Sequence, residues 1–164
     1  MAEEVENQEA AVPDEPPRGI YPARLDDRGR LKLPEKFQKY LAGLPEKKLF
    51  VTSKDRVMAS VYPIRLWRAN EEVIKNFSGK RTVAGRVWFT TQDLGSEAEM
   101  DGQGRIQFSP ELRRDLHMEN QPVKVLFENG AILVMTEDTF QQKRVQSQKS
   151  AEEDLDALGQ VGFV

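Results

Sequence analysis

The segment LDDRGRLKLPEKF, residues 25–37, combines the signals of a tight turn, a half-buried strand and the start of a helix. Asp26 and Gly29 favour a chain reversal, because an aspartate side chain can close a turn and glycine accepts the positive φ that tight reversals require. Two leucines then alternate with basic residues, which is typical of a strand with one buried face. Pro34 suits the start of a helix, where its missing N–H has no partner to lose. The segment therefore predicts strand, turn, strand and a short helix that packs on the sheet.

The same pattern returns 75 residues later in MDGQGRIQFSPEL, residues 100–112. The matching turn residues are Asp26, Gly29 and Arg30 in the first copy and Asp101, Gly104 and Arg105 in the second. Each copy is followed by two apolar stretches with a turn between them, and then by a bulky residue. A unit of about 50 residues buries too little surface to be stable alone. We therefore expect two similar halves, 18–69 and 94–144, to pack as a pseudo-dimer into one mainly β unit with short helices, an α+β protein.

The connecting segment, residues 70–93, predicts a helix followed by a strand. Its first part has apolar residues at helical spacing and Gly79 as a stop signal. Its second part contains RVWFTT, residues 86–91, which is rich in β-branched and aromatic residues and predicts the strand. We interpret Trp88 as a core or interface residue. The helix residues expected to face the core are Val73, Ile74 and Phe77.

The net charge of −3 conceals a basic central region. Residues 1–17 contain six acids and no base, and residues 150–164 contain four acids and no base. Because both ends are also poor in bulky apolar residues, we expect disordered acidic tails at 1–17 and 145–164. The intervening residues 18–149 carry a net charge of +7, and a basic surface of this kind attracts a polyanion such as nucleic acid.

Several classes of protein are disfavoured by what the chain lacks. It has no cysteine, one histidine and no apolar run near the roughly 20 residues of a membrane span. The acidic start is unlike a signal or transit peptide, so we expect a cytoplasmic protein. There is no pair of histidines, no phosphate-binding loop and no cluster of carboxylates at the spacing of a reactive site. We therefore expect no enzyme activity, cofactor, metal, small-molecule substrate or membrane contact.

The first turn concentrates basic side chains on one side of a strand. Alternation sends Leu31 toward the core and Arg30 and Lys32 outward, and Arg24 and Arg28 share this outward parity. A two-stranded ribbon fits the major groove of DNA, where arginine binds phosphates or forms bidentate hydrogen bonds with guanine. The residues that we predict to bind DNA are Arg24, Arg28, Arg30, Lys32 and Arg105.

A purely structural role for the repeated turn is the competing interpretation. Asp26 can close the turn while Arg30 pairs with it, without any contact with DNA. The two interpretations are compatible if Asp26 and Asp101 orient arginines whose free edges bind DNA, and we favour this combination. Arg113 and Arg114 on the second helix are interpreted as a solvated face.

Charge divides unequally between the two halves. Residues 18–67 have a net charge of +7, whereas residues 94–144 have −3 and keep only Arg105 at the turn. We therefore expect the first half to supply most of the DNA affinity and the second half mainly to build the oligomer.

The sequence resembles a known family over about residues 18–140. The resemblance is carried by GIYPARLDDRGRLKLPEKFQKYL, LFVTSKD, VYPIRLW, VAGRVWFTT and EMDGQGRIQFSPELR, and it points to the MraZ family of bacterial transcriptional regulators. The duplicated turn element is the specific part of the match. By residue, the family motif falls on Asp26, Arg28, Gly29, Arg30, Asp101, Gly104 and Arg105.

The resemblance implies a fold and a function. The fold is a pair of AbrB-like swapped-hairpin units fused into one pseudo-two-fold, barrel-like unit. The function is a regulator, usually a repressor, that associates with the nucleoid. It binds short direct repeats in promoter DNA, typically ahead of the division and cell-wall gene cluster, as a ring-shaped homo-oligomer of eight or more copies. Two alternatives stay open: an antitoxin-like regulator with a protein partner, and an assembly protein that does not bind DNA.

Overall fold

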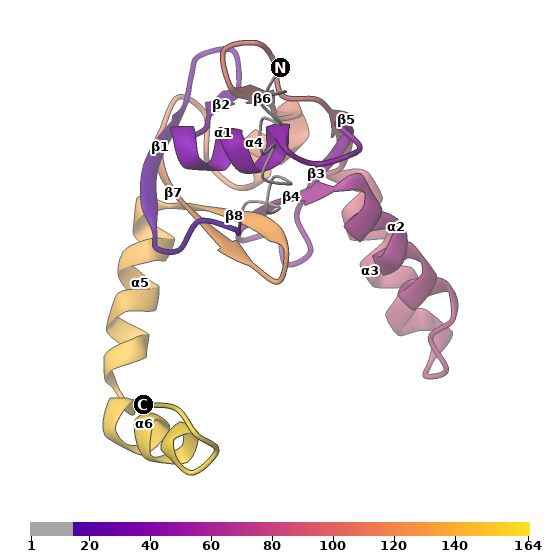
Figure 1. Ribbon diagram of the computed structural model, residues 1–164. Helices are drawn as coiled ribbons and strands as arrows, with labels where there is room; N and C mark the ends of the chain where they lie inside the picture. The colour runs from indigo at the N-terminus through magenta and orange to yellow at the C-terminus, as the bar shows by residue number, and fades with distance from the viewer. Residues whose placement is uncertain (1–14) are drawn as a thin grey trace, which may run out of the picture.

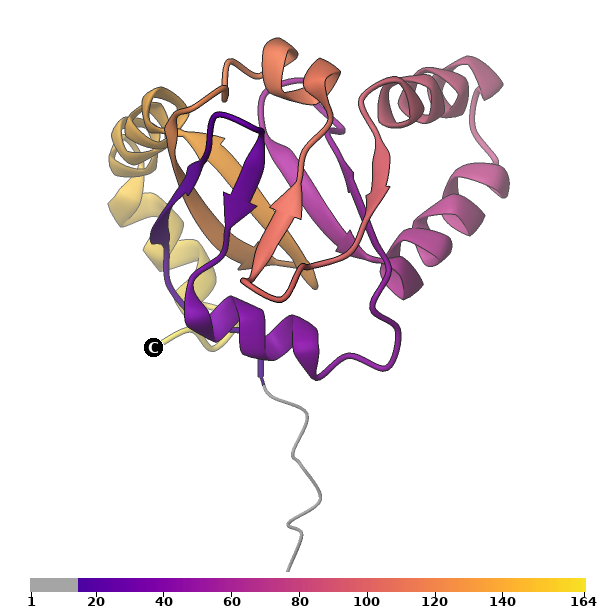
Figure 2. The ribbon, with the colours of Figure 1, turned by 90° about the horizontal axis from the view of Figure 1, so that it is seen from above.

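Within residues 15–164, which the computed structural model describes, one antiparallel sheet of eight strands carries the fold (Figures 1 and 2). The strand order across the sheet is β5-β3-β4-β8-β7-β1-β2-β6. The strands are β1 (Tyr21–Leu25), β2 (Arg30–Lys32), β3 (Leu49–Thr52), β4 (Ala59–Pro63), β5 (Ser96–Ala98), β6 (Arg105–Gln107), β7 (Pro122–Glu128) and β8 (Ala131–Thr136).

The two halves of the chain exchange strands. β1 of the first half pairs with β7 of the second, with Ala23 opposite Val123, and β5 of the second half pairs with β3 of the first, with Ala98 opposite Leu49. Ala98 stands 75 residues after Ala23, and Val123 stands 74 residues after Leu49, so the two pairings correspond once the halves are aligned with a one-residue difference before β7. Neither half completes its own sheet, which explains why the halves fold together.

Two further pairings join the halves across the pseudo-two-fold axis, β2 with β6 and β4 with β8, where Ser60 lies opposite Leu133. β2 and β6 are antiparallel neighbours, and Leu31 lies opposite Ile106, the same position of the other copy. The sheet curls into a barrel that stays open between its end strands β5 and β6, as the view from above shows (Figure 2). This arrangement confirms the predicted mainly β, barrel-like unit with pseudo-two-fold symmetry.

Six helices accompany the sheet in the described part of the chain. They are α1 (Glu35–Ala42), α2 (Ile64–Lys75), α3 (Arg81–Asp93), α4 (Pro110–Asp115), α5 (Glu137–Gln148) and α6 (Ala151–Gly159). The predicted start of α1 is confirmed. Pro34 precedes α1, and the Ser109 hydroxyl caps α4 by accepting the N–H of Leu112 at 3.2 Å.

The barrel interior holds the main hydrophobic core. Phe37 of α1 is fully buried, stacks on Phe127 at 5.0 Å between ring centroids and meets Tyr21 edge-on at 5.4 Å. A second, smaller cluster lies where α2 leaves the barrel, with Trp67 stacked on Phe50 at 4.6 Å. Trp67 is therefore a core residue that joins α2 to the sheet.

The predicted strand at residues 86–91 is wrong, because this segment is the second half of helix α3. The local preference of β-branched and aromatic residues is easily overridden by context. Here Ala84 and Thr91, at helical spacing, are buried, and the carbonyl of Thr91 accepts a hydrogen bond from the Thr52 hydroxyl at 2.7 Å. A projecting segment without a neighbouring strand satisfies its backbone groups only as a helix.

The expectation that residues of α2 after its first turns face the core is also wrong. Val73 and Phe77 are 67% and 41% exposed, and Ile74 is half-buried. The helix leaves the barrel after Trp67, so its outer part projects with α3 as a hairpin (Figure 1).

The C-terminal tail expected to be disordered is helical as far as Gly159. Its acidic residues stabilise the helix. Glu152, Glu153 and Asp154 lie in the first turn of α6, where the helix dipole favours negative charge. Of the predicted N-terminal tail at 1–17, residues 1–14 lie outside the described residues. Each helix within residues 15–164 is too short or too polar to span a lipid bilayer.

Substitution of the central aromatic residue tests this account of the core. We expect Phe37→Ala to lower the free energy of unfolding by about 3–5 kcal/mol, because it removes a fully buried ring and leaves a cavity. The control Val57→Ala, at a half-exposed apolar residue of the β3–β4 turn, should change it by less than about 0.5 kcal/mol. Chemical denaturation followed by circular dichroism measures both, and equal effects would contradict the assignment of Phe37 to the core.

Candidate nucleic-acid interface

The first repeated turn is held by its aspartate. Oδ1 of Asp26 accepts the N–H groups of Arg28 and Arg30, each at 2.9 Å, and Oδ2 accepts Nε of Arg30 at 2.9 Å. The main chain closes the same turn, since the N–H of Gly29 donates to the carbonyl of Asp26 at 3.0 Å. One carboxylate therefore fixes both the backbone of the turn and the direction of the Arg30 side chain.

The second turn repeats this geometry. Oδ1 of Asp101 accepts the N–H groups of Gln103 and Arg105, both at 2.9 Å, and Oδ2 accepts Nε of Arg105 at 2.8 Å. The N–H of Arg105 is the largest cause that lowers the pKa of Asp101 to about 2, and the Arg105 guanidinium adds to it. The N–H of Arg30 likewise lowers the pKa of Asp26 below its ordinary value. Both carboxylates are thus ionised hydrogen-bond acceptors in the turns.

Each turn also needs its glycine. Gly29 and Gly104 have φ of +76° and +74°, a region that side chains with a Cβ disfavour. A Cβ on Gly29 would lie 2.3 Å from the guanidinium of Arg113, and one on Gly104 would lie 2.1 Å from the amide of Gln38. Arg113 and Gln38 are equivalent residues of α4 and α1, so each helix places one polar side chain against the turn of the opposite half.

Pairing of β1, β2 and β6 aligns three cations across the outside of the barrel. Arg24 lies opposite Lys32, and Lys32 lies opposite Arg105. Directly opposite residues have Cβ atoms about 4.5–5.5 Å apart, so the three side chains form a row. They point outward because their strand neighbours Leu31 and Ile106 are fully buried.

A second outward pair lies two residues further along β2 and β6. Arg30 is opposite Gln107 on the same face. We call the outward residues of these strands the basic face: Arg24, Arg30, Lys32, Arg105 and Gln107. In Figure 2, β2 and β6 lie side by side between α1 and α4, and in Figure 1 this end of the barrel is at the top.

The two halves support each other's turns at the basic face. Nε2 of Gln107 donates to the carbonyl of Arg28 at 2.8 Å, and the ammonium of Lys32 donates to the carbonyl of Gln103. Arg24 is held at the edge of the face by the carbonyl and side-chain oxygens of Asn120, at 3.1 and 3.2 Å. The face is thus a pre-organised surface rather than a set of loose side chains.

The arginines keep hydrogen-bonding capacity after pairing with aspartate. Arg30 and Arg105 use Nε for the carboxylate, and among residues 15–164 the structure gives their terminal nitrogens no hydrogen bond. The same holds for the exposed side chain of Arg28 in the first turn. Such nitrogens can donate to phosphate oxygens or to the acceptor edge of guanine. No group of three or more metal-ligating side chains occurs in this part of the chain.

The structure brings the predicted residues together but changes the interpretation of Arg113. Arg105 of the second half stands beside Lys32 of the first, so the second turn is part of the same surface. Arg113 does not lie on a solvated face as expected, because it is half-buried against the turn of Gly29, whereas Arg114 is exposed.

Sequence reasoning missed Gln38 and Gln107 as supports of the turns. A signal existed in the repeat, since Gln38 aligns with Arg113 and Gln107 aligns with Lys32 at the same spacing of 75 residues. The contacts themselves cross between the halves, and only the strand exchange reveals them.

Comparison with known proteins finds curated relatives in several bacteria, although no family model matches the chain. A protein of Acidobacterium capsulatum named transcriptional regulator MraZ is 29% identical over 146 residues, which cover 89% of this chain and 99% of the relative. Proteins of the same name from Koribacter versatilis and Actinobacillus pleuropneumoniae are 30% and 31% identical over 105 residues. Those matches cover 63% of this chain, and 71% and 69% of the relatives. These relatives are named as regulators and not as enzymes.

Protonation of Asp101 at low pH should weaken the hydrogen bonds that hold the second turn. The pKa of Asp101 is depressed, so the turn contributes its full stability above the ordinary value of 3.8 and loses it as the pH falls toward about 2. Carbon-detected NMR titration of the Asp101 carboxyl group should give a midpoint near 2. Asp101→Asn should remove this titration and shift the Arg105 Nε resonance at neutral pH. A midpoint at the ordinary value would contradict the hydrogen-bonded turn.

Glycine substitutions test the geometry of the same turn with a matched pair. Gly104→Ala should lower the free energy of unfolding by about 1–2 kcal/mol, because alanine at this positive φ is strained. Gly102→Ala should be within about 1 kcal/mol of the parent, since its φ is not positive and an added Cβ meets no atom within 4 Å. Urea denaturation compares the two, and equal stabilities would disprove the conformational requirement.

Proposed function

The chain belongs to the MraZ family, and on that premise we propose that it is a transcriptional regulator that binds double-stranded promoter DNA with its basic face. The observation that carries the proposal is the row formed by Arg24, Lys32 and Arg105 beside the aspartate-held Arg30. These cations come from both halves of the chain but occupy one surface.

Two kinds of contact are expected within this surface. The charges of Arg30 and Arg105 are partly balanced by their carboxylates, so their contribution is directional hydrogen bonding from fixed terminal nitrogens. Arg24, Arg28 and Lys32 are not paired with a carboxylate among residues 15–164 and supply most of the attraction to phosphates. We therefore assign base recognition to Arg30, with Arg105 as its second-half counterpart, and backbone binding to the others.

The proposed targets are short direct repeats, bound by several copies of the chain. We propose a ring-shaped homo-oligomer of eight or more subunits, because weak contacts at each basic face add up when several faces engage several repeats. Following the family resemblance, we place the repeats ahead of the division and cell-wall gene cluster and propose repression as the outcome. A cytoplasmic, nucleoid-associated location agrees with this role.

We also propose that residues 18–69 and 94–144 are the two functional repeats. The first has the larger positive charge, so we expect it to hold most of the DNA. The strand exchange means that neither repeat presents its turn without the other. The fused pair is therefore the DNA-binding unit.

Removal of the oriented arginine tests the proposal. Arg30→Ala should weaken binding to a promoter fragment with direct repeats by about 5- to 150-fold, the effect of losing one specific base contact worth about 1–3 kcal/mol. Binding to unrelated DNA should change much less. Fluorescence anisotropy at several salt concentrations measures both affinities, and circular dichroism checks the fold.

The control is Arg68→Ala, which removes an exposed arginine of α2 that pairs with Glu46 away from the basic face. It should leave DNA affinity unchanged. If Arg30→Ala binds the repeats as tightly as the parent, the assignment of Arg30 to DNA recognition is wrong.

A further inference from the structure

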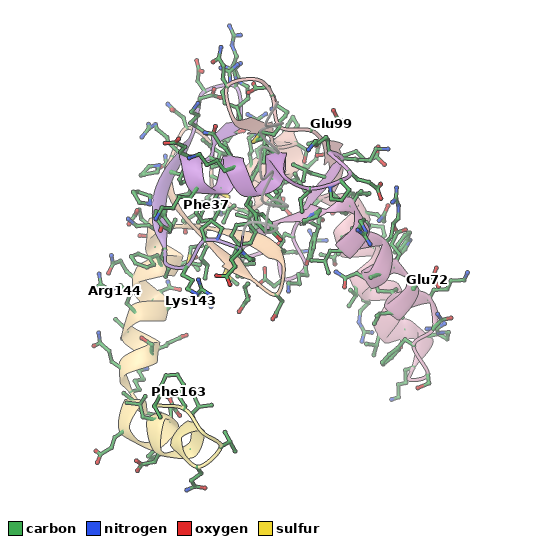
Figure 3. All side chains as sticks on the ribbon, in the orientation of Figure 1. Phe37, Glu72, Glu99, Lys143, Arg144 and Phe163 are labelled. Atoms are coloured by element: carbon green, nitrogen blue, oxygen red, sulfur yellow. The ribbon has the colours of Figure 1, made fainter. Side chains whose placement is uncertain are left out.

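Two helical arms leave the barrel on opposite sides (Figure 1). One is the hairpin of α2 and α3, and the other is α5 continued by α6. Figure 3 shows Glu72 on the hairpin and Phe163 at the end of the other arm, far from each other in the same chain. Neither arm belongs to the basic face, so the proposed DNA contact does not explain their surfaces.

The hairpin exposes an unusual number of apolar side chains. The hairpin face, as we call it, consists of Val73, Phe77, Val83, Val87, Trp88 and Phe89. Phe89 is 67% exposed and Trp88 is 40% exposed, and so many exposed large apolar side chains on one short hairpin indicate an interaction site. A groove of about 590 Å³ runs between α2 and α3 beside Trp88. Its floor at Gly85 is open, since an added Cβ there meets no atom within 4 Å.

The hairpin holds its own shape without a partner chain. The guanidinium of Arg81 donates to the carbonyls of Lys75 and Phe77 at 3.2 and 2.9 Å, which caps the end of α2. Ala84, at the contact with α2, is buried. The groove is therefore a formed feature of the hairpin.

The last residues of the chain form a second apolar surface. The tail face, as we call it, consists of Leu155, Leu158, Val161, Phe163 and Val164, all at least half-exposed. The N–H groups of Val161 and Phe163 donate to the carbonyl of Leu158 at 3.0 and 3.1 Å, so the chain folds back over the end of α6. Gly162 permits this reversal with φ of +106°.

Charge favours contact between the tail and the outer part of the hairpin. The groove itself is lined by two acids, Glu71 and Glu72, and two bases, Lys75 and Arg81. Residues 75–92 as a whole contain four bases and no acid, whereas residues 150–164 contain four acids and no base. Apolar side chains lie among the charges on both sides. A helix as short as α6 is marginally stable in water by itself, so burial of its apolar side would stabilise it.

We propose that the tail face of one copy packs into the groove between α2 and α3 of a neighbouring copy, beside Trp88. The arms of one chain lie on opposite sides of its barrel, which leaves a second copy as the occupant (Figure 1). The contact joins two different surfaces, so it is head-to-tail and can be repeated around a closed ring. It rests on the oligomer of the proposed function and assigns which surfaces build it.

Cysteine cross-linking tests the contact directly, because the chain contains no cysteine. Full-length copies with Leu158→Cys are co-expressed with full-length copies of different mass that carry Gly85→Cys. Under mild oxidation we expect about tenfold more disulfide-linked heterodimer than from Leu158→Cys with Val57→Cys, because groups in contact have effective concentrations far above those in free solution. Since each copy has one cysteine, a heterodimer reports contact between copies. A yield equal to the control overturns the proposal.

Charge reversal provides a second measurement on the full chain. Glu153→Lys with Asp156→Lys in the tail should lower the assembly mass measured by light scattering, and so should Lys80→Glu with Arg86→Glu in the hairpin. Combination of all four should restore the parent mass if the two surfaces meet. Masses that do not recover argue against the contact.

The outcomes separate this proposal from the proposed function. If the cross-link fails while Arg30 remains necessary for binding promoter DNA, only the arm contact is wrong. If the cross-link forms while Arg30→Ala binds DNA normally, the arm contact stands and the assignment of Arg30 to DNA recognition is wrong.

Discussion

The antiparallel pairing of β2 with β6, centred on Leu31 opposite Ile106, is the contact on which the functional surface depends. Each strand follows one of the repeated turns, so the pairing fixes both turns relative to each other. The inward side chains of these strands close the core, and the same alternation turns their cations outward. A shift by one residue would reverse both faces together, so the stability of the barrel enforces the register of the basic face.

The carboxylate in each turn has a cost and a benefit for DNA binding. A negative charge beside a phosphate backbone is unfavourable, but Asp26 places its charge among two N–H groups and one guanidinium. The arginine gains a fixed direction, so it loses less side-chain freedom when it binds a ligand. In the proposed function, nearby cations that pair with no carboxylate among residues 15–164 supply the attraction to DNA, so orientation and charge come from different side chains of one small surface.

In the proposed model, the barrel carries the DNA-binding surface and the arms carry the contacts between copies. Strand exchange makes the two repeats one folding unit, and its basic face lies at one end of the barrel (Figures 1 and 2). The arms extend away from that end and expose apolar residues that the core does not need. A chain built in this way can assemble through its arms while its basic faces stay accessible. Multivalent binding of repeated sites needs both properties.

The sequence by itself determined the repeat, the two turns, the helix start at Pro34, and the outward parity of the cations. These are local properties, because turn chemistry and strand alternation act over a few residues. Only the tertiary structure decided that residues 86–91 are helical, that the acidic tail is helical, and that Arg105 stands beside Lys32. These depend on which segments become neighbours, and strand exchange between the halves leaves no local signal of its partners.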